Sequence, residues 1–116
     1  MNTVPRAAGS DAVIVLTTLA ADVDAAELAR TLVEERLAAC VNVLPAMTSF
    51  YRWKGTLEEE REQQLIIKTV AGRVTALAAR LKELHPYEIP EFLVLQTTGG
   101  SEAYLEWLRE STSRTA

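Results

Sequence analysis

The sequence predicts an α+β domain of the ferredoxin-like split βαβ class, in the order β-α-β-β-α-β followed by a C-terminal helix. Three observations predict this class. Apolar strand-like runs alternate with amphipathic helical stretches, two long extended segments meet at one glycine turn, and 116 residues suffice for a single domain. The predicted domain covers residues 12–110, and residues 1–11 and 111–116 are predicted to form flexible tails.

The first two elements are a strand and a helix. Residues 12–19 (Ala-Val-Ile-Val-Leu-Thr-Thr-Leu) form a continuous apolar run, which is typical of a central strand covered on one or both faces. Asp24 and Glu27 have the spacing of a capping box, so a helix is predicted to begin there. Its apolar residues recur at helical spacing, which predicts one face packed on a sheet; they are Leu28, Ala29, Leu32, Val33 and Leu37.

Two long extended segments follow, at residues 40–53 and 57–70, around a turn at Lys54-Gly55. Pro45 inside the first segment predicts a bend. An arm of this length spans about 46 Å as a strand, whereas a compact domain of this size is about 35 Å across. The hairpin therefore overhangs the domain, and its open strand edge predicts a closed homo-oligomer with Tyr51 and Trp53 at the interface.

The second half of the chain repeats the helix-strand pattern. A helix is predicted over residues 72–84, and residues 92–96 (Phe-Leu-Val-Leu-Gln) form the last strand. Gly99 and Gly100 then interrupt the chain, and Ser101 is predicted to cap a short final helix.

Composition excludes several classes of function. The net charge is −4 and no Lys/Arg-rich run is present, which argues against nucleic-acid binding. No apolar stretch approaches membrane-spanning length, and no secretory signal is recognisable near the first residues. The single cysteine, Cys40, cannot form an internal disulfide, so a cytoplasmic protein without a paired-cysteine zinc site is expected.

Residues 85–91 (His-Pro-Tyr-Glu-Ile-Pro-Glu), here called the elbow, combine the only histidine with two prolines and two carboxylates. Each proline restricts its own φ and keeps the preceding residue extended, so the elbow is predicted to be rigid. The imidazole of His85 and the carboxylates of Glu88 and Glu91 are groups that can bind a cation. Alternatively, Pro86 only ends the helix, His85 caps it and Pro90 opens the next strand.

Several motifs together resemble the CutA family of divalent-cation tolerance proteins. They are residues 37–42 (Leu-Ala-Ala-Cys-Val-Asn), 51–55 (Tyr-Arg-Trp-Lys-Gly), 65–69 (Leu-Ile-Ile-Lys-Thr), 85–91 and 104–108 (Tyr-Leu-Glu-Trp-Leu). The resemblance implies a ferredoxin-like protomer in a tight homotrimer, similar in architecture to PII signalling proteins. It also implies a cytoplasmic role in tolerance or binding of divalent cations, copper above all.

The expected cation ligand is His85, with Glu88, Glu91 or a neighbouring subunit's carboxylate completing the shell. His85 is expected to contribute little to the core, so its removal should leave the fold nearly unchanged. Cys40 lies in an apolar setting where a thiol packs as a small hydrophobe, and a ligand role is the alternative.

Two positions depart from some relatives of the CutA family. Thr17 stands where these relatives carry a cysteine, and Leu84 stands where they carry a second histidine. Because copper prefers thiolate, thioether and imidazole ligands, the site expected here should be weaker or differently selective.

Lys68 interrupts an apolar strand and either reaches solvent or faces a polar cleft between subunits, with Glu60, Trp53 and Tyr87 as neighbours. The acidic run at residues 58–62 is read as a solvated strand face that could also attract cations.

Three functions stay open: a weakly metal-binding tolerance protein, a PII-like regulatory module that binds a small ligand in the cleft, and a trimeric scaffold. No nucleophile has a base and an orienting group beside it, so the protein is not expected to be an enzyme. The sequence identifies no protein partner.

Overall fold

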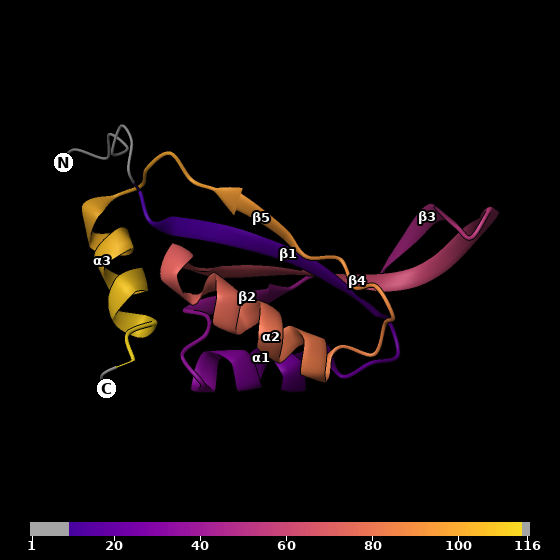
Figure 1. Ribbon diagram of the computed structural model, residues 1–116, viewed down its shortest axis with the longest axis horizontal. Coiled ribbons are helices and arrows are strands. Elements are labelled where there is room, and N and C mark those ends of the chain that lie inside the picture. Colours follow the sequence, from indigo (N-terminus) through magenta and orange to yellow (C-terminus); the bar gives the residue numbers. More distant parts are fainter. Residues whose placement is uncertain (1–9, 115–116) are drawn as a thin grey trace.

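The computed structural model describes residues 10–114, which form one antiparallel sheet with two helices on one face and a third helix at one end (Figure 1). The strands are β1 (Ala12–Ala20), β2 (Cys40–Val43), β3 (Met47–Trp53), β4 (Thr56–Val70) and β5 (Leu93–Gln96). The helices are α1 (Ala25–Glu34), α2 (Val74–Leu84) and α3 (Glu102–Ser111), with a 3₁₀ turn at Ala71–Arg73 before α2. This element order confirms the predicted class.

The sheet is built around β4. Its strand order is β2-β4-β1-β5, and β3 also pairs with β4, beyond the end of β2. The predicted first arm is therefore two strands, separated at residues 44–46. Pro45 lies in this gap and has no N–H to donate to the ladder, which agrees with the predicted bend.

The core lies between the sheet and the helices α1 and α2. Alternate residues of β1 point into it, and they pair across the sheet with alternate residues of β4, as in Val15 with Ile67. Helix residues close the cluster from the other side; they are Leu28, Leu32, Leu77 and Leu81. The apolar stripe of α1 is narrower than predicted, because Val33 is exposed.

The first helix begins as predicted and ends in a Schellman motif. Asp24 accepts a hydrogen bond from the Glu27 N–H at 3.1 Å, as expected for an N-cap. Arg36 adopts φ +61°, and the Leu37 N–H donates to the Leu32 carbonyl at 3.0 Å. This sharp stop turns the buried Leu37 back into the core.

The β3–β4 hairpin projects from the body of the domain (Figure 1). Lys54 and Gly55 both have positive φ, +50° and +81°, as a type I′ turn requires. The molecule measures 49 × 29 × 23 Å, so the long axis exceeds the diameter of a compact domain and the predicted overhang is confirmed.

Helix α3 lies at the end of the domain opposite the hairpin (Figure 1). Ser101 caps it by accepting from the Tyr104 N–H at 3.3 Å, as predicted. Leu105 and Leu108 pack against Ala12 and Ala39 in a second small cluster. No helix within residues 10–114 is long and apolar enough to cross a membrane.

Parts of the predicted tails pack on the domain. The Ser10 hydroxyl accepts from the Ala12 N–H at 3.2 Å, and the Thr112 hydroxyl donates to the Leu108 carbonyl at 2.9 Å. Ser10 and Thr112 are both buried, and Arg109 forms an ion pair with Asp11 at 3.2 Å. The packed region therefore extends beyond residues 12–110, whereas tail positions 1–9 and 115–116 lie outside the described residues.

Candidate functional site

The elbow connects the helix layer to the opposite face of the sheet. Helix α2 ends at Leu84, and His85 is extended with φ −86° and ψ 131°, as Pro86 requires. The chain then passes the end of β1, and residues 87–91 reach the face that α1 and α2 leave open.

His85 fastens the elbow to β1. Its side chain is only 7% exposed, and the Tyr87 N–H donates to Nδ1 at 3.1 Å. With Nδ1 accepting, Nε2 carries the proton and donates to the Thr18 carbonyl at 2.6 Å. Both ring nitrogens are therefore occupied, and the expectation that His85 contributes little to the core is wrong.

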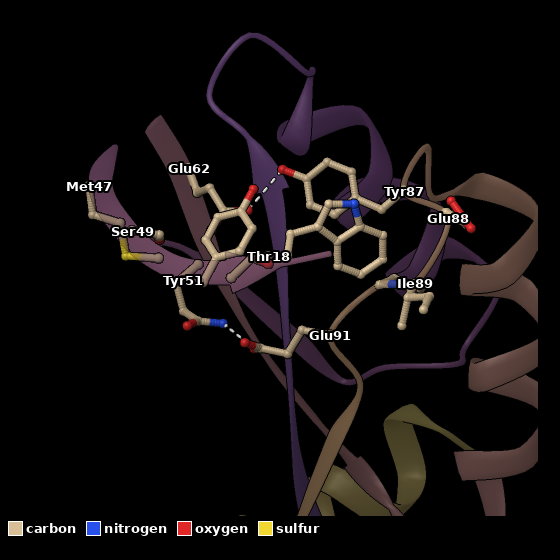
Figure 2. A pocket seen from close by; sticks show the side chains of 12 residues that line it. Thr18, Met47, Ser49, Tyr51, Glu62, Tyr87, Glu88, Ile89 and Glu91 are labelled. Atoms are coloured by element: carbon tan, nitrogen blue, oxygen red, sulfur yellow. Dashed lines mark hydrogen bonds between the residues drawn. The ribbon is translucent and has the colours of Figure 1, made fainter. Parts of the chain in front are cut away.

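A pocket of about 660 Å³ lies between the elbow and the inner face of the hairpin (Figure 2). Alternate residues of β3 supply one wall, and the pairing of Met47 with Glu62 places β4 residues on the same face. The pocket is lined by Thr18, Met47, Ser49, Tyr51, Trp53, Glu62, Gln64, Tyr87, Glu88, Ile89, Pro90 and Glu91.

Glu62 is the most buried acid of the pocket, at 7% exposure. Its Oε2 accepts a hydrogen bond from the Tyr87 hydroxyl at 2.8 Å (Figure 2). No basic side chain of residues 10–114 forms an ion pair with it. Buried carboxylates are normally paired with cations or metal ions, so the negative charge of Glu62 is not compensated by any described residue.

The Tyr87 phenol is held in its neutral form. Burial raises its pKa well above the ordinary 10, and the hydrogen bond to Glu62 and the negative charge of that carboxylate raise it further. Partial burial and the charges of Glu60, Glu62 and Glu58 also raise the pKa of Tyr51. The pocket therefore carries negative potential from the hairpin acids.

Of the two elbow carboxylates, only Glu91 is oriented into the pocket. The Gln64 amide donates to Glu91 Oε2 at 3.0 Å and to the Thr17 carbonyl at 2.7 Å, which holds Glu91 against the sheet. Glu88 points away from Glu62 (Figure 2) and lies 4.0 Å from the Lys54 ammonium at the rim.

Cys40 does not join the elbow. It pairs with Lys68 of β4, whereas Thr18, which binds His85, pairs with Gln64. Positions 64 and 68 are four residues apart, about 13 Å along a strand. The structure therefore does not bring Cys40 to His85 within the protomer.

The predicted cleft group is only partly assembled in one protomer. Trp53 and Tyr87 line the pocket, but Glu60 is exposed and outside the lining. Lys68 lies six residues from Glu62, about 20 Å along β4. Its placement in an inter-subunit cleft stays a prediction, because it requires a second protomer.

The two departures from the CutA relatives lie outside the pocket. The Thr17 side chain is fully buried in the core, and its hydroxyl has no hydrogen-bond partner among the described residues. Leu84 is exposed at the end of α2. No group of three or more His, Cys, Asp or Glu side chains within residues 10–114 is arranged to hold a metal ion.

Sequence reasoning missed Glu62 and Gln64. The acidic run around Glu62 was interpreted as a solvated strand face, yet Glu62 is covered by the elbow. The alternation of β4 was the available signal, since Glu62 and Gln64 share a face with Ile66. The element that covers this face comes from a distant part of the chain, so the strand pattern alone does not reveal it.

The chain matches the model of the CutA1 divalent ion tolerance protein family over residues 13–111. It belongs to this family. It is 46% identical over 99 residues to the divalent-cation tolerance protein CutA of Thermus thermophilus, covering 85% of this chain and 96% of that protein. It is 48% identical over 101 residues to the CutA protein of Pectobacterium atrosepticum, covering 87% and 92% of the two chains.

Solved CutA structures share the fold of this CutA1-family chain. The structure of CutA from Synechococcus elongatus superimposes with a TM-score of 0.86 at 40% identity, covering 97% of this chain and 96% of that one. CutA from Xylella fastidiosa gives a TM-score of 0.84 at 44% identity, covering 90% and 100%. These matches confirm the family resemblance and the fold class drawn from the sequence.

Replacing His85 with Ala should lower the free energy of unfolding by about 2–4 kcal/mol, because the buried Thr18 carbonyl and Tyr87 N–H lose their partner. Chemical denaturation measures this difference. Leu84→Ala, at the exposed neighbouring position, is the control and should change stability by less than about 1 kcal/mol. A loss equal to that of the control would show that the imidazole does not fasten the elbow.

The phenol of Tyr87 should ionise well above pH 10 in the folded protein. Because the unfolded chain loses this proton first, stability from the Tyr87–Glu62 contact is complete below pH 10 and declines as pH rises above it. In a variant with Tyr51→Phe and Tyr104→Phe, phenolate absorbance reports Tyr87 alone. Adding Glu62→Gln should move the transition back toward pH 10, and an unmoved transition would contradict the assigned cause.

Proposed function

We propose that this CutA1-family protein acts as a cytoplasmic homotrimer that binds a divalent cation, copper included, at the acidic wall of the elbow pocket. The observation that carries the proposal is Glu62, a buried carboxylate that has a phenol as its partner and no cation. Glu91, a ligand expected from the sequence, lines the same pocket. The family name, divalent ion tolerance protein, agrees with a cation as the ligand.

The cation ligands proposed here are the carboxylates of Glu62 and Glu91, whereas the main ligand expected from the sequence was the His85 imidazole. Nδ1 of His85 already accepts the Tyr87 N–H, so a metal ion would have to displace a buried hydrogen bond. In contrast, no described residue donates a hydrogen bond to Oε1 of Glu62 or of Glu91. One protomer offers fewer ligands than a divalent ion needs, so we propose that a neighbouring subunit's carboxylate completes the shell.

Isothermal titration of the metal-free protein with Cu²⁺ and Zn²⁺ tests this site. Glu62→Gln and Glu91→Gln should each weaken binding by at least about tenfold, because each removes a negatively charged oxygen ligand. Glu106→Gln, on the exposed side of α3, is the matched control and should leave binding unchanged. If Glu62→Gln kept full metal affinity and His85→Gln lost it, the carboxylate site would be wrong and the imidazole would be the metal ligand.

The proposed homotrimer is supported by apolar side chains and a strand edge that are exposed to solvent in a single protomer. The projecting hairpin exposes Phe50 and Leu57, and the edge strand β5 exposes Leu93 and Leu95. Exposed apolar residues and an open strand edge are features of protein interfaces. Tyr51 and Trp53, which line the pocket on the hairpin, are the interface residues proposed from the sequence.

Sedimentation equilibrium should show a trimer that does not dissociate at micromolar concentration. Trp53→Ala should weaken the assembly by about 2 kcal/mol or more, as loss of an interface aromatic commonly does. Trp107→Ala, an equally large truncation on the exposed face of α3, is the control and should not change the assembly. A stable monomer would contradict the proposal.

A second candidate function is a regulatory trimer that binds a small organic ligand in the same pocket. The observation that favours it is the cavity volume of about 660 Å³, far more than a bare ion fills and typical of small-molecule sites. We propose no catalytic activity for either function. The separation of Cys40 from His85 and the backbone hydrogen bonds of the imidazole support this view.

A further inference from the structure

We propose that the elbow pocket takes an organic cation: a primary ammonium group on a short apolar body. This inference rests on the second candidate function, in which the pocket is a small-ligand site, and it names the chemical class of the ligand. It depends on the lining, the charge and the anchoring acid of the pocket.

The lining of the pocket suits an apolar body. Met47, Tyr51 and Trp53 form the hairpin wall, and Ile89 and Pro90 form the elbow wall. Small-molecule sites combine such apolar walls with a few converging polar groups, which fix the orientation of the ligand. A hydrated metal ion alone would leave these aromatic and aliphatic surfaces without contacts.

The charge of the pocket selects a cation. Its lining contains Glu62, Glu91 and, pointing away at the rim, Glu88, and it contains no Lys or Arg side chain. The ammonium group of Lys54 lies outside this lining, 4.0 Å from Glu88. An anionic ligand would be repelled by Glu62 and Glu91, whereas a cation would satisfy the buried acid of the pocket.

Glu62 is the anchor for the ammonium group. The side chain is more than nine-tenths buried, and its Oε2 is held by the Tyr87 hydroxyl, which fixes the carboxylate in place. Oε1 receives no hydrogen bond from residues 10–114 and is free to accept an ammonium N–H. Such charge-assisted bonds are about twice as strong as neutral ones.

The aromatic side chains of the hairpin wall offer ring faces that a cation can contact. A cation over the face of a tryptophan or tyrosine ring is attracted by the negative potential of that face. The Trp53 ring already accepts the Lys54 ammonium, whose nitrogen lies 5.5 Å from the ring centroid. Carboxylates and aromatic faces together recognise an organic cation better than either group alone.

Calorimetry with three probes of matched shape tests the inference on the whole chain in metal-free buffer. The probes are phenethylamine, phenethyl alcohol and phenylpropionate, which differ mainly in charge. We expect phenethylamine to bind at least about tenfold more tightly than the alcohol, and phenylpropionate not to bind. Glu62→Gln should remove this preference, while Glu106→Gln should keep it.

Thermal unfolding of Glu62→Gln shows whether the variant keeps its fold, and Glu91→Gln serves as a second variant that should weaken the amine several-fold. Equal binding of the alcohol and the amine, or binding of phenylpropionate, would overturn the cation class and leave the small-ligand function standing. Binding of none of the three probes would overturn both.

Discussion

The antiparallel pairing of β1 with β4 is the constraint on which the rest of this structure depends. It joins Ala12–Ala20 to Glu62–Val70 in one register, and every other element is placed relative to it. Side chains alternate between faces, so this register sends Leu65 and Ile67 to the helices and Glu62 and Gln64 to the open face. A register shift of one residue would turn Leu65 and Ile67 toward the open face and Glu62 and Gln64 toward the helices. Burial of the apolar side chains disfavours this shift.

The pocket is a consequence of β4 extending beyond β1. The outer half of β4 has only β3 as a partner, so the hairpin leaves the body of the domain and presents one wall (Figure 1). The second wall is the elbow, which is held by two hydrogen bonds of the His85 imidazole and by the hydrogen bonds of Tyr87 and Glu91 to β4. The histidine thus contributes to the site through backbone geometry, while carboxylates and aromatic rings face the cavity.

Burying Glu62 without a basic partner works against stability, because a desolvated carboxylate loses its hydration. The hydrogen bond from Tyr87 recovers part of this loss, and it also keeps one oxygen of the acid in a defined position. A buried acid whose charge is balanced by no cation among the described residues is a feature of many functional sites. The cation site proposed for this CutA1-family protein therefore depends on one carboxylate, that of Glu62.

The sequence by itself determined the elements, their order and the overhang of the hairpin, because these depend on local signals: apolar periodicity, the Asp24 and Ser101 caps, Pro45, and the Lys54-Gly55 turn. It also located the elbow, because two prolines mark that segment, and the structure places Tyr87 and Glu91 of this segment in the pocket lining. Only the tertiary structure decided that His85 faces the interior and that Glu62 is buried. Residues 85–91 pack over β1, where His85 meets Thr18 at a separation of 67 positions, and over β4, where Tyr87 meets Glu62 at a separation of 25. No local pattern encodes such long-range contacts.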